Sequence, residues 1–180
     1  MAEPILIYGK SGSGKSRSLK NFAEDEIFFV NVISKRLPFP KKFKYEARTS
    51  DYEIIKNQLS KMPCKVAVID DAGYLMTNTF MTGHSNPKGG ASTFDLFNTI
   101  GDQFWSLIQF IKKALPEDVR VYFMMHEISN DTGEVKVRTI GKFDLDRDTI
   151  DKSTILAGAG IFFGSIICNV FTRIGGFVFA

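Results

Sequence analysis

Residues 9–16 decide the fold, and they read Gly9-Lys10-Ser11-Gly12-Ser13-Gly14-Lys15-Ser16. A glycine, four free positions and then Gly-Lys-Ser is the spacing of a Walker A loop. Its glycines let the backbone wrap an anion closely, so that successive N–H groups and the positive end of the next helix point at a phosphate. The apolar run at 5–8 predicts a buried strand before the loop, and a helix is expected over about 15–23. This context favours a phosphate-binding loop over a chance match in a flexible linker.

The loop predicts ATP with Mg²⁺ as cofactors. Lys15 is expected to reach the β- and γ-phosphates, and Ser16 to give its hydroxyl to the metal, which neutralises charge as the terminal phosphate leaves. The sequence does not decide between adenine and guanine. The predicted nucleotide-binding residues are Gly9, Ser11, Gly12, Ser13, Gly14, Lys15, Ser16 and Arg17.

A second apolar run, residues 65–69, delivers two carboxylates at its end, Asp70 and Asp71. Ligands of open α/β sheets collect at the carboxyl ends of strands, so Asp70 is expected to contact Mg²⁺ directly or through water, in the Walker B role. Asp71 either polarises the attacking water as general base or caps the helix that follows. Both interpretations of Asp71 stay open.

A further predicted strand, residues 119–125, ends at His126 and Glu127. A polar residue at this edge of the sheet can sense a terminal phosphate and relay its presence to nearby loops. His126 is therefore a candidate sensor, with a purely structural histidine as the alternative. Glu127 competes with Asp71 for the role of general base, and the sequence does not choose between them.

The rest of the pattern is that of an α/β protein. Apolar residues at three- and four-residue spacing predict a long helix from about Thr93 to Leu115. Ser50 and Glu53 form a predicted capping box, residues 78–92 a predicted loop and residues 128–140 a β-hairpin. We expect a mostly parallel sheet flanked by helices, with the hairpin as an insertion, in a single P-loop ATPase domain over residues 1–180.

Composition excludes several classes of protein. The chain has 180 residues, 44% of them hydrophobic and 24% charged, with a net charge of +3, which is typical of a soluble globular protein and of neither a disordered nor a fibrous one. Two distant cysteines, Cys64 and Cys168, predict neither a zinc site nor a disulfide framework, and they fit a reduced, cytoplasmic compartment. No signal-peptide pattern is recognised at the N-terminus.

The apolar stretch from Ile155 to Ala180 has two interpretations. Arg173 is its only charge, and its length approaches that of a membrane span. Five glycines and several polar residues interrupt it, which favours buried late strands of a parallel sheet.

Together these motifs resemble a known family. The Walker A loop, the Asp70-Asp71 pair, the His126-Glu127 strand end and a hairpin leading to Thr139-Ile140-Gly141-Lys142 are similar to the small RecA-like ATPases of bacteriophages, the group that includes Sak-type single-strand annealing proteins. The resemblance covers about residues 5–142. It implies ATP-dependent binding of single-stranded DNA in phage recombination or replication, in the cytoplasm of a bacterial host, and a homo-oligomer.

The same resemblance carries roles to individual residues. It assigns nucleotide and metal roles to Lys15, Ser16 and Asp70, and a sensor role to His126. Lys142 either reaches the nucleotide of a neighbouring subunit as a basic finger or is a solvated lysine after a turn glycine.

Residues 35–48 are a candidate nucleic-acid segment in their own right. Single strands need cations together with stacking faces, and this segment interleaves them with Phe39, Phe43 and Tyr45. The alternative is a solvated basic loop whose aromatic rings lie in the core. The candidate cations are Lys35, Arg36, Lys41, Lys42, Lys44 and Arg48.

Two other classes of function stay open. A small-molecule or nucleotide kinase is one, although such enzymes use several arginines in a closing lid and this chain has only four after Arg48. A nucleotide-gated assembly factor or membrane-associated partner is the other, because the apolar C-terminal stretch allows it.

Overall fold

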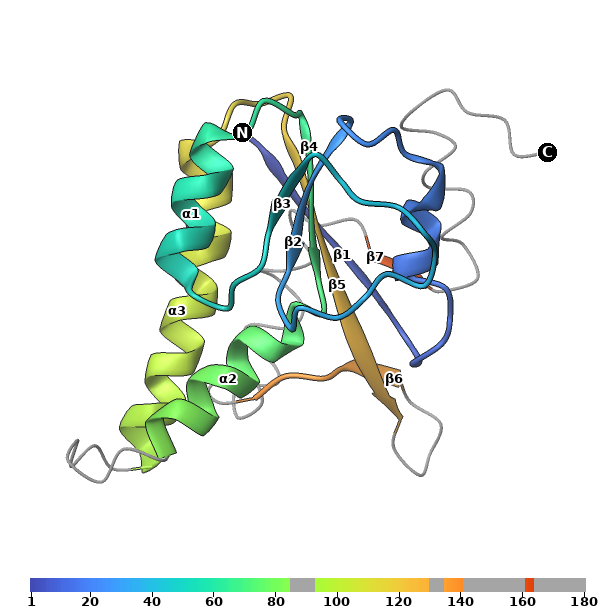
Figure 1. Cartoon of the computed structure of the whole chain (residues 1–180). Coiled ribbons are helices and arrows are strands. Elements are labelled where there is room, and N and C mark those ends of the chain that lie inside the picture. The colour runs from blue at the N-terminus through green and yellow to red at the C-terminus, as the bar shows by residue number, and fades with distance from the viewer. Residues whose placement is uncertain (85–92, 130–134, 141–160, 164–180) are drawn as a thin grey trace.

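The computed structural model describes residues 1–84, 93–129, 135–140 and 161–163. They form an α/β fold in which helices flank a parallel sheet (Figure 1). The helices are the short 3₁₀ helix η1 (Ser16–Asn21), α1 (Tyr52–Lys61), α2 (Gly73–His84) and α3 (Thr93–Ala114). The strands are β1 (Glu3–Gly9), β2 (Ile27–Asn31), β3 (Tyr45–Ala47), β4 (Val66–Asp70), β5 (Arg120–Ser129), β6 (Val135–Val137) and β7 (Ile161–Phe163).

The strand order is β3-β2-β4-β5-β1-β7, and every neighbouring pair in it is parallel. The strand β6 pairs antiparallel with the end of β5, which confirms the predicted hairpin pairing; its connecting residues, 130–134, lie outside the described residues. The strands that end at Gly9 and at Asp70 both neighbour β5. This arrangement is compatible with a RecA-like fold.

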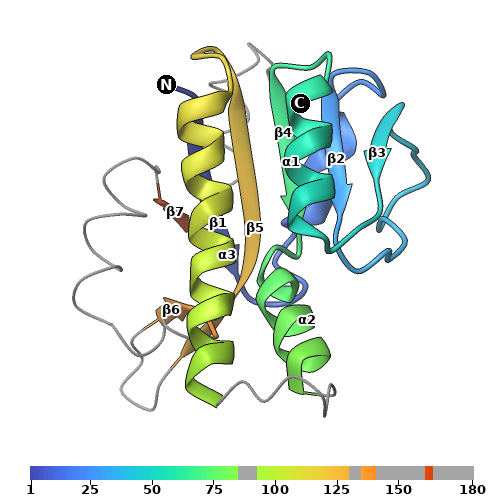
Figure 2. The ribbon, with the colours of Figure 1, turned by 90° about the vertical axis from the view of Figure 1, so that its left-hand side faces the viewer.

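Alternation along the strands separates two apolar layers. One layer includes Val30, Ile69 and Phe123 and packs against α1, α2 and α3, which lie on one face of the sheet (Figure 2). The other layer includes Phe29, Val68 and Met124 and packs against Leu19 of η1 and against Phe39 and Phe43. Full burial of each large apolar side chain contributes about 1.5 to 3 kcal/mol. The sheet is thus covered on both faces, as a parallel sheet requires.

The same alternation positions the polar strand ends. Asn31 follows Val30, Asp70 follows Ile69, and both therefore point to the face covered by η1. His126 follows Met125 of the helix-facing layer and points the same way. Polar residues from three strands consequently gather on one face, at the carboxyl edge of the sheet.

Two local predictions differ from the structure. The loop predicted over 78–92 is wrong for residues 78–84, because α2 continues to His84; residues 85–92 lie outside the described ones. Helix α1 is capped by Asp51 and not by Ser50. One carboxylate oxygen of Asp51 accepts hydrogen bonds from the backbone N–H groups of Glu53 and Ile54, at 2.8 and 3.0 Å. Asp51 directly precedes the first helical residue, which is where a side chain can reach those free donors.

The apolar C-terminal stretch is described only at β7. There, residues Ile161–Phe163 extend the sheet by pairing with β1, as the strand interpretation predicts. Within the described part of the chain, no helix combines the length and the apolar character needed to cross a membrane.

Candidate functional site

The glycine-rich loop, residues 10–15, leaves the carboxyl end of β1 and enters η1. Gly12 and Gly14 have φ angles of 77° and 93°, in the left-handed region that only glycine adopts without strain. The space around both glycines is open, so the constraint comes from the backbone and not from crowding. The predicted helix over 15–23 is the shorter 3₁₀ helix η1.

The Lys15 side chain is folded back under this loop. It is 6% exposed, and its ammonium donates to the carbonyl oxygens of Gly9 at 2.6 Å and Lys10 at 2.8 Å. Burial lowers the pKa of Lys15, while the charges of Asp71 and Asp70 act in the opposite direction. The loop therefore supplies its own carbonyl partners to the ammonium that the sequence assigns to a phosphate.

Ser16 and Asp70, 54 residues apart, form the contact that joins the loop to β4. The Ser16 hydroxyl lies 3.0 Å from one carboxylate oxygen of Asp70 and 2.9 Å from the other. Asp70 is 1% exposed, and burial raises its pKa above the ordinary value. The charge of Lys35 lowers this pKa, and the charge of Asp71 raises it. A hydroxyl and a carboxylate are hard oxygen ligands, so this pair fits Mg²⁺, which binds through one or two carboxylates with phosphate and water.

Asp71 is held in an unusual backbone conformation. Its φ angle is 56°, which is uncommon for a residue with a side chain and costs about 1 to 3 kcal/mol where it occurs. The carboxylate is 3% exposed and contacts the ammonium of Lys35 on one oxygen and His126 Nε2, at 3.3 Å, on the other. Its backbone carbonyl accepts from the N–H of Tyr74 at the start of α2. The Asp71 side chain thus contacts other residues of the candidate site, and its backbone carbonyl accepts a hydrogen bond at the start of α2.

Lys35 belongs to this site, which the sequence did not predict. Its ammonium lies 3.3 Å from Asp70 Oδ2 and also contacts Asp71 Oδ2. Burial alone lowers the pKa of Lys35, but the hydrogen bond to Asp71 and the charge of Asp70 outweigh it, and the pKa is raised. In the structure its ammonium faces the two carboxylates and is not presented as an outward DNA contact.

Asn31 positions the Lys35 backbone. Its side-chain amide donates to the Lys35 carbonyl at 2.8 Å and accepts from the Lys35 N–H at 3.1 Å. Ser34, between them, has a φ angle of 54° and closes the turn. Asn31 is also the register partner of Asp70. A sequence signal existed, since Asn31 is a polar residue that ends an apolar strand, as Asp70 does.

His126 and Glu127 occupy different faces of β5. His126 is the register partner of Gly9, and its ring meets Tyr74 edge-on with centroids 6.5 Å apart. The His126 carbonyl accepts from the N–H of Arg138 beside β6, at 2.9 Å. Strand alternation places Glu127 on the opposite face from His126. His126 contacts Asp71, whereas Glu127 acts on the site through its charge, which opposes the lowering of the Lys15 pKa by burial.

A cavity of about 310 Å³ lies between the glycine-rich loop, the turn that carries Lys35, and the side chains of Asp71 and His126. No family model matches the chain, and no curated protein matches it either. The chemistry of the cavity is therefore inferred from its walls, which carry the loop amides, four cationic side chains and one carboxylate. The lining residues are Ser11, Gly12, Ser13, Gly14, Lys15, Ser16, Arg17, Lys35, Arg36, Pro38, Asp71 and His126.

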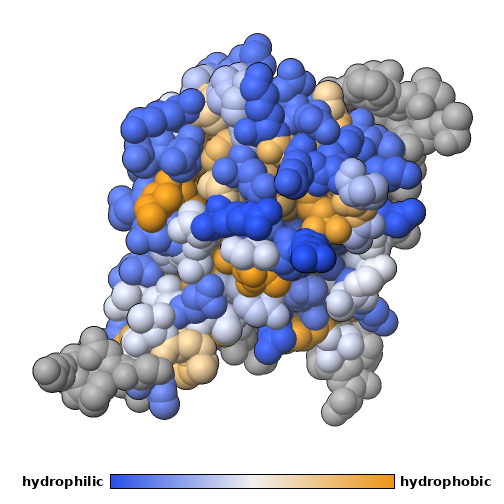
Figure 3. All heavy atoms as spheres, viewed as in Figure 1, coloured by the Kyte–Doolittle hydropathy of each residue, from blue (hydrophilic) through white to orange (hydrophobic). Residues whose placement is uncertain are grey.

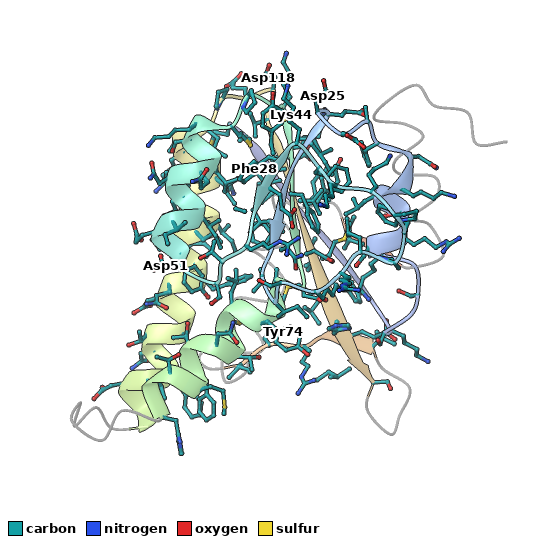
Figure 4. The ribbon with its side chains drawn as sticks, viewed as in Figure 1. Asp25, Phe28, Lys44, Asp51, Tyr74 and Asp118 are labelled. Carbon is teal, nitrogen blue, oxygen red and sulfur yellow. The ribbon has the colours of Figure 1, made fainter. Side chains whose placement is uncertain are left out.

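The predicted nucleic-acid segment is divided between the two edges of the sheet. Phe28 is the register partner of Tyr45, so Lys44 lies at the amino edge, where Figure 4 shows it with Asp25 and Asp118, far from Tyr74. Arg36 lies at the carboxyl edge, in the wall of the cavity. The ammonium of Lys41 donates to two carbonyls at the end of η1, at 2.6 Å each, and therefore closes that helix.

Phe39 and Phe43 follow the alternative interpretation, in which the aromatic rings of the segment lie in the core. These rings are 9% and 5% exposed, because both belong to the apolar layer beneath η1. Tyr45 is half-buried and carries the Lys44 ammonium 5.3 Å above its ring. Figure 3 shows a mostly hydrophilic face with separate hydrophobic patches. The candidate cations that stay exposed are Arg36, Lys42, Lys44 and Arg48, the last paired with Glu46; Lys142 lies outside the described residues.

Proposed function

We propose that this protein is a RecA-like P-loop ATPase that binds ATP with Mg²⁺ in the cavity at the carboxyl edge of the sheet. The contact between Ser16 and Asp70 carries the proposal. It sets a hydroxyl and a buried carboxylate side by side at the start of η1, next to a glycine loop and Lys15. The volume of about 310 Å³ is at the lower end of the range for small-molecule sites.

Each group has a defined task in this proposal. The loop amides and the Lys15 ammonium bind the phosphates, Lys15 exchanging the Gly9 and Lys10 carbonyls for phosphate oxygens. Ser16 and Asp70 would hold the metal, and Mg²⁺ there would neutralise negative charge on the phosphates as the terminal phosphoryl group is transferred to water. The buried location strengthens these interactions relative to water.

Asp71 is the general base in this scheme, with His126 as its partner. Asp71 and His126 both line the cavity, and Glu127 is not among its lining residues. His126 also connects Asp71 to the hairpin through the hydrogen bond from Arg138, which supports the sensor role. A change at the terminal phosphate thus has a direct mechanical route to β6.

Single-stranded DNA is the partner we propose, with recombination or replication as the process and a homo-oligomer as the working form. The proposal rests on the sequence resemblance and on the exposed cations Arg36, Lys42, Lys44 and Arg48. Lys35 and Lys41 leave this set because their ammonium groups bind within the fold. Each substitution that removes a cation bound to a DNA phosphate should reduce the salt dependence of binding by about 0.7 in the log–log slope.

Steady-state ATP hydrolysis with and without single-stranded DNA tests the proposal. We expect hydrolysis by the wild type, stimulation by DNA, and loss of turnover in Lys15→Ala but not in Lys113→Ala, an exposed lysine of α3. Calorimetric titration with Mg-ATP separates binding from turnover. Absence of nucleotide binding would refute the ATP site, equal rates with and without DNA would refute the partner, and phosphate transfer to a nucleoside would establish the kinase alternative.

A further inference from the structure

The candidate site contains two buried carboxylates, and the two lysines near them differ in what they contact. Two adjacent carboxylates, Asp70 and Asp71, are 1% and 3% exposed. Removing one partner of a buried ion pair is strongly destabilising, so such carboxylates need a cation. The Lys15 ammonium is bound to carbonyls of the loop, whereas Lys35 contacts both carboxylates. Lys35 is therefore the lysine in direct contact with both carboxylates.

Lys35 also stands at the oxygen that the metal needs. Its ammonium is 3.3 Å from Asp70 Oδ2, and the Ser16 hydroxyl is 2.9 Å from the same oxygen. A divalent cation bound by Ser16 and Asp70 would meet the positive charge of Lys35 at short range, and that repulsion is strong in a partly buried site. The ammonium and the metal therefore compete for one place.

We propose that Lys35 is a built-in counter-cation that excludes a divalent metal from Asp70 until a nucleotide draws it away. This inference rests on the proposed function, in which the site takes Mg-nucleotide. Metal and nucleotide then bind together, and neither Asp70 nor Asp71 is released for chemistry while the cavity holds no phosphate. The device links the start of catalysis to occupancy of the loop.

The surroundings of Lys35 allow this exchange. Asn31 fixes its backbone through two hydrogen bonds, so the movement is confined to the flexible four-carbon side chain. Lys35 lines the same cavity as the glycine-rich loop, so phosphate oxygens in that cavity can become its new partners. Its departure leaves one oxygen of Asp71 free to accept a proton, while His126 keeps contact with the other.

The test is Mn²⁺ binding to nucleotide-free protein, measured by the paramagnetic resonance signal of free Mn²⁺. We expect Lys35→Gln to bind Mn²⁺ at least about tenfold more tightly than the wild type, or about 1.4 kcal/mol. Lys35→Arg retains the charge and should resemble the wild type. Lys65→Gln is the matched control, because it removes a lysine paired with an exposed aspartate, Asp118, away from the site.

With a non-hydrolysable ATP analogue added, the Mn²⁺ affinities of the wild type and Lys35→Gln should differ by no more than about threefold. Equal Mn²⁺ affinities without nucleotide would overturn the inference, as would tight Mn²⁺ binding by the nucleotide-free wild type. Thermal melting establishes that each variant folds. If Lys35→Gln does not, the same comparison is made in an Asp71→Asn background, where only one carboxylate lacks its cation.

The two hypotheses fail separately. Tighter Mn²⁺ binding by Lys35→Gln than by the wild type, without any nucleotide binding, would refute the ATPase proposal and leave Lys35 as a competitor for the metal. Nucleotide binding together with equal Mn²⁺ affinities of the wild type and Lys35→Gln would refute the role of Lys35 and leave the ATPase proposal intact.

Discussion

Two sets of lysine–aspartate contacts lie at opposite edges of the sheet, and they differ above all in burial. At the amino edge, Lys65 lies 2.7 Å from Asp118, with side chains that are 75% and 55% exposed. At the carboxyl edge, Lys35 contacts Asp70 and Asp71, which are almost fully buried. Figure 4 places Asp118 at the far end of the sheet from Tyr74, which neighbours the site.

The difference is visible in the carboxylates. The hydrogen bond and the charge of Lys65 lower the pKa of Asp118, as is usual for an exposed ion pair. Burial raises the pKa of Asp70 in spite of Lys35. An exposed pair adjusts to solvent at little cost, whereas a buried carboxylate raises the free energy of the folded state and is tolerated where it has a task. Burial, and not the presence of a lysine, distinguishes the candidate site.

The largest expected effect at the carboxyl edge comes from a change at Asp70, and it is on the rate of ATP hydrolysis. If the proposed ATPase is right, Asp70→Asn removes the charge assigned to the metal, and we expect ATP hydrolysis to fall by about two to three orders of magnitude, the range seen when one preorganised electrostatic group is removed. Steady-state phosphate release measures it. Asp118→Asn should leave the rate unchanged, and a similar loss in both variants would show that the effect is not specific to the site.

The next largest effect is on stability. Lys35→Gln leaves two buried carboxylates without their lysine. A fully buried pair broken in this way costs about 3 to 5 kcal/mol, but Lys35 is 34% exposed and screened by solvent, so about 1 to 3 kcal/mol is expected. Urea unfolding of nucleotide-free protein measures the loss. Unchanged stability would mean that the contact with Lys35 does not stabilise the folded state.

Stability should also depend on pH through Asp70. Because its folded-state pKa lies above the ordinary 3.8, the folded protein retains a proton that the unfolded chain has already released. The contribution of this group to stability is therefore present below 3.8 and is lost as pH rises through the folded-state pKa. Thermal midpoints of Asp70→Asn should exceed those of the wild type by a margin that grows with pH. A margin that shrinks would reverse the sign of the argument.

The sequence predicted the parts of the site that depend on local pattern. Residues 9–16 and the pair Asp70-Asp71 are contiguous motifs next to apolar strands, and in the structure the Ser16 hydroxyl donates a hydrogen bond to Asp70. The parallel sheet is predicted from continuous apolar runs together with the glycine-rich loop, and the long helix α3 from apolar residues at three- and four-residue spacing. These features can be predicted because each depends on residues that lie close together in the sequence.

The role of Lys35 could not be predicted in the same way. In sequence it is one of six cations between 35 and 48, and only the pairing of β2 with β4 brings its turn to Asp70. The burial of Phe39 and Phe43 likewise depends on the second apolar layer, which no local pattern describes. Tertiary contacts therefore converted part of a predicted DNA segment into a wall of the cavity.

The smallest effect is expected at the exposed pair. Lys65→Gln removes the hydrogen bond that lowers the pKa of Asp118, so the contribution of the pair is present above 3.8 and is lost as pH falls through the lower folded-state pKa. We expect a change in the urea midpoint near the limit of measurement at neutral pH. Because both side chains are exposed, about 1 M salt should abolish even this change. A loss as large as that of Lys35→Gln would mean that charge pairing itself, independent of burial, holds this fold together, and the contrast between the two edges would disappear.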